Sequence, residues 1–450
     1  MGPKQIGHMK QKMEDIAAAH LNNEMNERFD IVFYGVTGFT GTYVLKRLLT
    51  KQQKGQIRRD LTLAVAGRNE GKLKKVLDDV SKELDVNLAG TKIIIADSSN
   101  PESLANMAKQ AKVIVNTVGP FQKYGEAVIK AAVENGASHV DISGEAHWIE
   151  EMEATYNEKA AENGVYVVGA CGWDSIPCDF GVNFLKHNFG GDLNHVETFV
   201  QMNTGPAGYA LNEGTYQTAI LDVADPNLEE LNANREKIMP QKLPNPFYKV
   251  PSHKLPWGIP NIEGYALPFL GADKSIVNRS QYYDFIAHGE RPVQIETYFR
   301  LPSLCKTILA VPASAAFLGM AKLGCTRRIL QNYPDQMTMG MFKRNGPSME
   351  QMEQTSFTYW IFGSGWSEKL PLDQEHGEAP TVKKIARCDG PDPGYMATSG
   401  CLLSAALTIL DDRSSLPPRG GVYTSAAAFG RSKIYECLAN FDVKFTMVDQ

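Results

Sequence analysis

The feature that most constrains the fold is a glycine-rich turn between a predicted strand and a predicted helix near the N-terminus. Residues 29–34 form a mostly apolar run that predicts a strand buried on both faces, and residues 42–50 predict a helix. Glycines between them permit a tight turn, and the free N–H groups at the helix N-terminus suit a pyrophosphate. A tight turn without a ligand is the alternative interpretation. The predicted cofactor-binding loop consists of Gly35, Thr37, Gly38, Phe39, Thr40 and Gly41.

This strand–helix unit opens a regular alternation. Further strands are predicted at 61–66, 92–96, 112–118, 139–142 and 165–168. Helices are predicted between them at 72–84, 101–110, 126–135 and 148–163. Six strands that alternate with helices are typical of a parallel sheet covered by helices on both faces. The sequence therefore predicts a dinucleotide-binding domain over residues 29–182.

The end of the second predicted strand indicates which dinucleotide binds. Proteins that bind unphosphorylated NAD usually place Asp or Glu there to accept from the ribose hydroxyls. This chain has Arg68 instead, and a guanidinium suits a 2′-phosphate because it donates charge-assisted, bidentate hydrogen bonds. A surface arginine without a ligand is the alternative. We predict that NADP(H) is preferred over NAD(H).

Two further strand ends are expected to face the same cofactor. Asp97 follows the third strand and is expected to accept from the adenine amino group, or alternatively to cap the next helix. Val118, Gly119 and Pro120 end the fourth strand, where an open α/β sheet reverses its strand order and binds ligands. We expect this rigid backbone to lie against the nicotinamide; a plain turn is the alternative.

The alternation stops near residue 183. Seven of the 24 prolines fall between Pro240 and Pro268, a density that breaks regular structure. Later strands are predicted at 195–203, 293–301 and 355–362. They fit an antiparallel second domain over residues 183–389, which would shape the substrate site and, through its sheet, form a homodimer. An apolar helix is predicted at 394–410.

Composition excludes several classes of protein. The chain carries 46 basic and 51 acidic residues and no long basic run, so nucleic acid is not an expected partner. Its seven cysteines are irregularly spaced, which argues against a disulfide framework and for a reducing, intracellular compartment. Residues 1–28 lack the apolar core of a signal peptide and are predicted to be a flexible leader. Scattered histidines and unpaired cysteines predict no metal site.

No familiar catalytic motif is present. None of the 17 tyrosines is followed by lysine four positions later, so the acid–base pair of short-chain dehydrogenases is missing. Hydride transfer still needs a proton donor near the nicotinamide. Tyr124, and Asp174 just past the sixth strand, are the predicted catalytic residues. The alternative for Asp174 is that it, or Ser175, caps a helix, and Asp141 and Glu145 carry the same ambiguity.

One apolar segment allows two interpretations. Residues 307–321 are nearly all apolar and are bounded by Lys306 and Lys322. The segment is shorter than the ~20 residues that span a bilayer, and Pro312 interrupts it. It is predicted either as a buried helix of the second domain or as a segment lying in a membrane interface, with its cationic flanks near head groups.

A set of ordered motifs runs from the glycine loop to the C-terminal region. They are Ala66-Gly67-Arg68, Asn116-x-x-Gly119-Pro120-Phe121, Tyr124-Gly125-Glu126, Asp141-Ile142-Ser143-Gly144-Glu145, Gly172-Trp173-Asp174-Ser175-Ile176-Pro177, Gly214-Thr215, Gly390-Pro391-x-x-Gly394-Tyr395-x-Ala397-Thr398 and Gly420-Gly421-Val422-Tyr423-Thr424. In identity and order they resemble the motifs of the saccharopine dehydrogenase-like oxidoreductases, from about residue 29 to the C-terminus.

The resemblance implies an α/β fold: a Rossmann doubly wound parallel sheet, a second inserted α+β domain, and a C-terminal segment, 390–450, that returns to the first domain. It implies an NADP(H)-dependent oxidoreductase associated with the cytosolic face of lipid droplets or membranes, with mitochondria as another location. A bacterial branch of the family acts as a trans-acting enoyl reductase in lipid biosynthesis. A small-molecule or lipid-like substrate with a carbonyl or enoyl group is therefore expected.

Two other functions stand beside this one. A non-catalytic scaffold or sensor on lipid droplets would retain the dinucleotide fold without turnover. True saccharopine dehydrogenase chemistry ranks last, because saccharopine reductases usually open with Gly-x-Gly-x-x-Gly and bind their substrate's carboxylates with a cluster of arginines. This chain has Gly-x-x-Gly-x-x-Gly, and its sequence offers no convincing arginine set.

Overall fold

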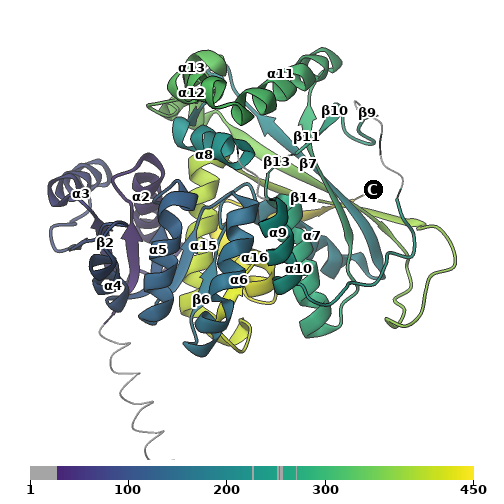
Figure 1. The fold of residues 1–450 in the computed structure, drawn as a ribbon, viewed down its shortest axis with the longest axis horizontal. Helices are drawn as coiled ribbons and strands as arrows, with labels where there is room; N and C mark the ends of the chain where they lie inside the picture. Colours follow the sequence, from purple (N-terminus) through teal and green to yellow (C-terminus); the bar gives the residue numbers. More distant parts are fainter. Residues whose placement is uncertain (1–27, 225–227, 251–252, 254–256, 270, 450) are drawn as a thin grey trace, which may run out of the picture.

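The computed structural model describes residues 28–224, 228–250, 253, 257–269 and 271–449. The leader predicted over residues 1–28 lies outside this part of the chain except for its last residue. Two seven-stranded sheets organise the described residues, and helices pack on each of them (Figure 1).

The first sheet is parallel, with the strand order β3-β2-β1-β4-β5-β6-β15. Its strands are β1 (Phe29–Tyr34), β2 (Leu63–Gly67), β3 (Lys92–Ile95), β4 (Ala111–Asn116), β5 (Ser138–Asp141), β6 (Tyr166–Val168) and β15 (Gly421–Tyr423). The order reverses between β1 and β4, as in a Rossmann fold. The predicted fold class is thereby confirmed. All six predicted strands are present, and β15 is a seventh that the alternation did not reveal.

Alternating side chains on β1 explain why helices cover both faces of this sheet. Ile31 and Phe33 lie in one hydrophobic cluster, whereas Val32 and Tyr34 lie in another. The first cluster includes buried side chains of α2 (Phe39–Gln53), α3 (Glu70–Leu84) and α15 (Thr398–Asp411), and the second includes those of α4 (Pro101–Lys109) and α5 (Phe121–Glu134). Because successive side chains point to opposite faces, this apolar strand requires a cover on each side.

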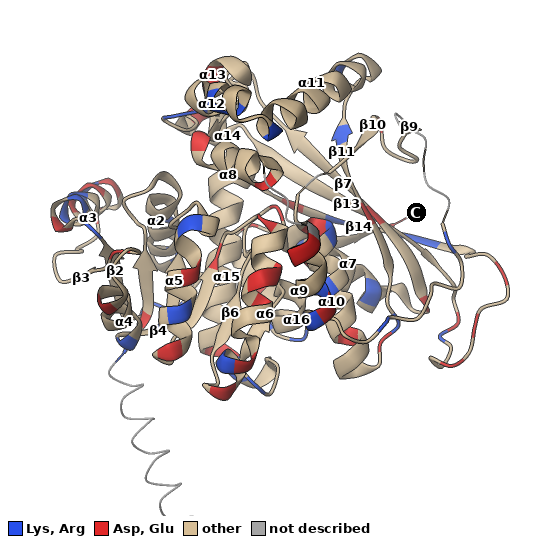
Figure 2. Ribbon diagram, in the orientation of Figure 1, with Lys and Arg blue, Asp and Glu red and all other residues tan. Residues whose placement is uncertain are grey.

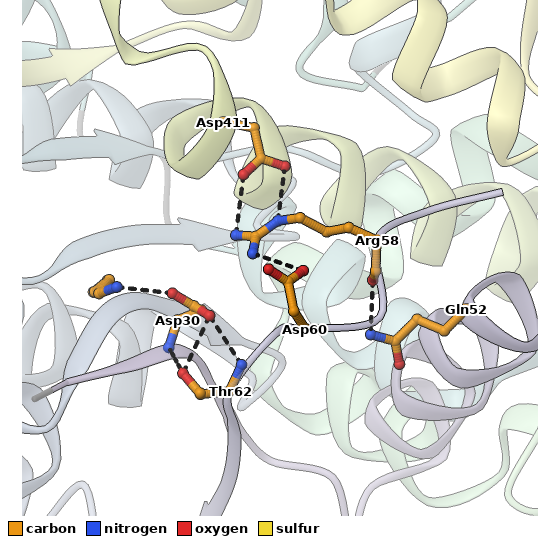
Figure 3. Close-up of polar contacts among 7 residues, drawn as sticks. Asp30, Gln52, Arg58, Asp60, Thr62 and Asp411 are labelled. Carbon is orange, nitrogen blue, oxygen red and sulfur yellow. Dashed lines mark hydrogen bonds and ion pairs between the residues drawn. The ribbon is translucent and has the colours of Figure 1, made fainter. Parts of the chain in front are cut away.

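Polar contacts at the amino edge of the sheet include an ion pair with helix α15 (Figure 3). Arg58 Nη2 lies 3.0 Å from Oδ1 of Asp411, the last residue of α15. Nearby, Asp30 at the start of β1 accepts from the backbone N–H of Thr62 at 2.9 Å. At the other end of α15, the hydroxyl of its first residue, Thr398, accepts from the backbone N–H of Trp173, which follows β6, at 3.2 Å.

The second sheet has the order β16-β14-β13-β7-β11-β10-β9. Its strands are β7 (Leu193–Asn203), β9 (Trp257–Gly258), β10 (Tyr265–Pro268), β11 (Gln294–Leu301), β13 (Ser356–Gly365), β14 (Val382–Pro391) and β16 (Lys444–Val448). The antiparallel arrangement expected from the sequence is wrong for one pair, because β7 and β11 are parallel. Parallel neighbours need a long crossover, and here it contains α8 (Glu213–Ala224), α9 (Leu228–Ile238) and α10 (Asp273–His288).

The chain passes between the two sheets more than once. Helix α7 (Ile176–Phe189) leads from β6 to β7 and packs on β13 and β14. After β14, a short π-helix (Pro393–Ala397) and α15 return to the first sheet, followed by β15, α16 (Ser425–Phe429) and α17 (Ile434–Asn440). The last strand, β16, pairs with β14. Residues 390–449 thus contribute to both sheets, whereas the sequence predicted that the segment 390–450 returns to the first domain.

A helical layer beyond the second sheet contains the apolar segment 307–321. The layer comprises α8, α11 (Leu304–Lys322), α12 (Gly324–Asn332), α13 (Pro334–Met337) and α14 (Met349–Glu353), with the two-stranded sheet of β8 (Leu211–Asn212) and β12 (Phe342–Lys343). In α11 only Thr307 and Ala321 are buried. By length and hydropathy, α11 and the segment Pro393–Asp411 are both apolar enough to cross a membrane, but only 11% of the α11 window is buried, against 83% of the other. The interpretation of 307–321 as a buried helix is therefore wrong.

Candidate active site

The glycine loop leaves the N-terminus of α2 open to a ligand. Gly35 has a φ of +105°, and a Cβ there would lie 2.8 Å from Thr117 Oγ1. A Cβ on Gly41 would lie 2.3 Å from the carbonyl oxygen of Gly35, so only glycine fits. Gly38 occupies the N-cap of α2 and supplies no capping side chain. The first N–H groups of α2 are thus available to an anion, and Thr37 and Gly38 are exposed beside them.

The ends of the second and third strands lie at the same edge of the sheet. Ala66 pairs with Tyr34, and Gly67 pairs with Ile95, so Arg68 and Asp97 follow neighbouring positions. Arg68 is exposed. The Ser99 backbone N–H and hydroxyl donate to Asp97 and lower its pKa, and the charge of Arg68 lowers it further.

The helix after Asp97 has another cap. Asn100 Oδ1 accepts from the backbone N–H of Ser103 at 3.1 Å and caps α4. The alternative role of Asp97 as that helix cap is therefore wrong. Asn69 serves α3 in the same way, accepting from Lys72 N–H at 2.9 Å, which leaves Arg68 without a capping role.

The end of β4 is held rigidly next to the glycine loop. The Asn116 side chain accepts from the backbone N–H of Val118 at 2.9 Å. Thr117 donates its backbone N–H to the carbonyl oxygen of Tyr34 at 2.9 Å. The Gly119–Pro120 peptide that follows is cis. These contacts place the end of β4 at the point where the strand order reverses.

A pocket of about 530 Å³ lies where three parts of the chain meet. The first domain contributes Gly38, Phe39, Thr40, Thr117, Gly119, Pro120, Phe121, Ile142, Gly144, Glu145, Gly172, Trp173 and Asp174. The second domain and the C-terminal segment contribute Tyr209, Leu211, Asn212, Glu213, Gly214, Thr215, Gln217, Thr218, Pro393, Gly394, Tyr395 and Thr398. The structure thus brings five of the eleven predicted cofactor-binding residues to one cavity, namely Gly38, Phe39, Thr40, Gly119 and Pro120, whereas Gly35, Thr37, Gly41 and Val118 are not part of its lining. Arg68 and Asp97 lie outside its lining.

Asp174 lines this pocket in the turn between β6 and α7. A Cβ on Gly144 would lie 3.1 Å from Asp174 Oδ2, and one on Gly172 would lie 3.2 Å from Oδ1, so two glycines make room for the carboxyl. Burial raises the pKa of Asp174 to about 6. Ser175 is the N-cap of α7 but makes no side-chain capping bond. The capping alternative for these two residues is wrong, and Asp174 faces the pocket instead.

Glu145 is a second pocket carboxyl, for which the sequence left a catalytic and a capping role open; it occupies the N-cap of α6 (Ala146–Glu162) but makes no side-chain capping bond. Its Oε2 accepts from the backbone N–H of Gly144 at 3.0 Å, whereas the buried Oε1 has no hydrogen-bond partner. Burial raises the pKa of Glu145 to about 7. The sequence signal that could have identified Glu145 is its motif, which begins at Asp141, the last residue of β5. Asp141, in the same motif, instead accepts from Ser143 and Ala170 and organises the turn.

Tyr124, the other predicted catalytic residue, does not reach the pocket. Its side chain is 43% exposed in the first turns of α5 and is not part of the lining. Tyr395 lines the pocket instead, and its hydroxyl accepts from the backbone N–H of Asn212 at 2.6 Å. Its ring lies 4.7 Å from that of Phe39, which joins the C-terminal segment to the glycine-loop helix. Among the residues described, no group of three His, Cys, Asp or Glu is arranged to hold a metal ion.

Comparison with known proteins gives a family and close relatives. Residues 31–168 match the family model of the saccharopine dehydrogenase NADP binding domain. The Lipid droplet localized protein of Caenorhabditis elegans is 53% identical over 93% of this chain and 98% of its own. The human Saccharopine dehydrogenase-like oxidoreductase is 38% identical over 93% and 97%. A Mycobacterium tuberculosis protein that carries the name trans-acting enoyl reductase is 29% identical over 89% and 93%.

Proposed function

The chain belongs to the saccharopine dehydrogenase-like oxidoreductase family, and on this premise we propose that it acts with NADP(H) on a lipid-related carbonyl or enoyl substrate. Its NADP-binding domain and the names of its relatives give the reaction class, oxidoreduction. The observation that supports the substrate class is the composition of the pocket wall.

The described lining of the pocket contains no Lys, Arg or His side chain. Its ionisable carboxyls are those of Glu145, Asp174 and Glu213, and the aromatic rings of Phe39 and Trp173 lie among them. A substrate with several carboxylates, such as saccharopine, would meet acidic groups and no cation there, which is electrostatically unfavourable. An uncharged, largely apolar substrate fits this wall better.

The residues present fit NADP(H). The uncapped N-terminus of α2 would hold the diphosphate, and the Gly41 position, where a Cβ would collide with the loop, allows the required close approach. Arg68 would bind the 2′-phosphate, and Gly119–Pro120 would lie against the nicotinamide. When bound, the reduced nicotinamide supplies a hydride to a carbonyl carbon or to the β-carbon of an enoyl group.

The protein must then supply a proton. Hydride addition leaves negative charge on the substrate oxygen, as an alkoxide or an enolate, and a protonated carboxyl can neutralise it by transferring its proton to the oxygen or the α-carbon. Because burial raises the pKa of Asp174 to about 6 and that of Glu145 to about 7, these two acids hold protons closer to neutral pH than ordinary carboxyls do. We assign the proton donor to this pair.

We also propose peripheral contact with lipid droplets, because a relative of 53% identity is a Lipid droplet localized protein. The second candidate function is a dinucleotide-binding sensor on the surface of lipid droplets. The exposed helix α11 favours this candidate. Such a sensor would bind NADPH and turn nothing over.

Turnover distinguishes the two. The purified protein should oxidise NADPH in the presence of at least one member of a panel of long-chain aldehydes, ketones and 2-enoyl thioesters, and Gly41→Ala should abolish both turnover and NADPH binding. NADPH binding without oxidation by any member would support the sensor. Oxidation of saccharopine with NADP⁺, at a rate above those of the lipids, would refute the proposed substrate class.

A further inference from the structure

Exposed apolar side chains are concentrated in one part of the described chain. Of the 16 large hydrophobic residues that are exposed, 11 lie between Leu304 and Met349. They are Leu304, Ile308, Leu309, Val311, Leu323, Ile329, Tyr333, Met337, Met339, Met341 and Met349. Single exposed apolar residues are ordinary, but a cluster of this size marks an interaction surface.

Helix α11 is attached on one side only. Phe317 lies 5.7 Å, ring to ring, from Tyr216 of α8, and Ala321 is buried in the same hydrophobic cluster. On the first half of α11, Ile308 is 56% and Leu309 is 70% exposed. A helix whose second half packs on α8 and whose first half buries only Thr307 lies along the surface of the protein rather than crossing a bilayer as an isolated span.

The first part of this region, up to Pro334, carries charge of one sign, and Asp335 is the first acidic residue after it. Residues 304–334 include Lys306, Lys322, Arg327 and Arg328 but neither Asp nor Glu. Figure 2 shows α11 without acidic residues, whereas α3 in the first domain carries both signs. Two copies of this surface facing each other would bring their cations together, so a symmetric dimer is disfavoured. Phospholipid head groups with negative charge would complement both the cations and the apolar side chains.

We propose that α11, α12 and the loop 337–341 form a docking surface for a phospholipid-coated lipid surface. The loop supports this, since Met339 at its tip is 97% exposed and Met337 and Met341 flank it. The inference rests on the proposed function in one respect, which is that a lipid-related substrate would be reached from such a surface.

One helix, α8, contacts both the docking surface and the pocket. Five residues in the first half of α8 line the pocket, Glu213, Gly214, Thr215, Gln217 and Thr218. Tyr216 and Ile220 of the same helix pack in the hydrophobic cluster that includes Ala321 of α11. A protein seated through α11 would therefore hold one wall of its pocket close to the lipid. This explains why an apolar helix of this length is kept outside the core.

The test is flotation of the full-length protein with phosphatidylcholine vesicles, with vesicles that also contain phosphatidylserine, and with triolein droplets coated by the same phospholipids. Ile308→Asp combined with Leu309→Asp should weaken binding by more than about tenfold, because each buried aliphatic side chain contributes about that factor. The matched controls are Ile286→Asp and Leu372→Asp, two exposed apolar residues elsewhere (48% and 42% exposed), which should bind like the unmodified protein.

The charge contribution has its own variant. Lys322→Gln with Arg328→Gln should reduce the preference for phosphatidylserine by about fivefold per charge. Added salt should also reduce this preference in the unmodified protein, because it screens the charges. Unaltered flotation of the Ile308/Leu309 variant would overturn the proposal. A stable dimer of the unmodified protein in the absence of lipid, replaced by a monomer in this variant, would overturn it as well. NADPH binding and oxidation of a short-chain soluble substrate should stay unchanged in all these variants, so a failure of docking is distinguishable from a failure of the proposed enzyme function.

Discussion

Replacement of Asp174 by Asn should stabilise the protein at neutral pH while it lowers turnover. The Asp174 carboxyl is held in the pocket between Gly144 and Gly172, and burial raises its pKa from the ordinary 3.8 to about 6. An acid with a higher pKa in the folded chain binds more protons when folded, so unfolding between the two values releases protons. The contribution of the Asp174 carboxyl to the free energy of unfolding therefore falls as pH rises through this window and is lost above the folded pKa.

The magnitude follows from the shift. Two pKa units correspond to roughly 3 kcal/mol between the fully protonated and fully ionised limits. Between about pH 5 and about pH 8, the same shift predicts that the free energy of unfolding of the unmodified protein falls by about 1.4 kcal/mol. The Asn variant does not share this loss. Asn is close in shape to Asp and carries no charge, so the difference between the two proteins isolates the titration of Asp174.

The assay is guanidinium unfolding of both proteins across this pH range, followed by tryptophan fluorescence and by circular dichroism. Coincident transitions by the two probes are required before free energies of unfolding are compared. We expect the stability of Asp174→Asn, relative to the unmodified protein, to rise with pH. A relative stability that is flat, or that falls as pH rises, would show that the carboxyl titrates at an ordinary pKa and is not buried as described.

Three further predictions concern the cofactor and the proton donor. Arg68→Ala should weaken NADPH binding by about tenfold or more in a fluorescence titration, because a hydrogen bond between charged groups is lost, and should leave NADH binding unchanged; equal loss for both cofactors would refute the assigned role. Gly41→Ala should abolish NADPH binding, since its Cβ would lie 2.3 Å from the Gly35 oxygen, whereas Gly90→Ala, with no atom near the new Cβ, should bind normally; binding by the Gly41 variant would exclude the loop as the diphosphate site. In the unmodified protein the reductive rate should fall as pH rises through about 6 to 7, and Glu145→Gln should remove the upper part of that pH profile; an identical profile in the variant would exclude Glu145.

The first sheet and the cofactor edge were predictable because their signals are local. A strand such as β1 is buried on both faces and therefore has a continuous apolar run in its sequence. The carboxyl ends of parallel strands also meet at one edge of the sheet. The glycine loop, Arg68 and Gly119 could therefore be placed at one edge of the sheet without coordinates. The strand β15 was not predicted, because it joins the sheet after a long excursion through the second domain.

The pocket carboxyls and the exposed helix depend on distant contacts. Nothing local shows that Glu145 has a buried, unpartnered oxygen or that Tyr124 points to solvent, because both outcomes depend on how α5 and α6 pack. The hydropathy of residues 307–321 is the same whether α11 is covered or not; its exposure follows from the position of α8, which supports one side only. The parallel pairing of β7 and β11 is likewise set by the crossover that separates them.

The most direct measurement is a structure of the protein with NADP⁺ bound. It should place the diphosphate at the N-terminus of α2, the 2′-phosphate against Arg68, and the nicotinamide beside Gly119–Pro120 and inside the pocket that Asp174 and Glu145 border. A nicotinamide bound outside this pocket, or a 2′-phosphate that Arg68 does not contact, would contradict the account.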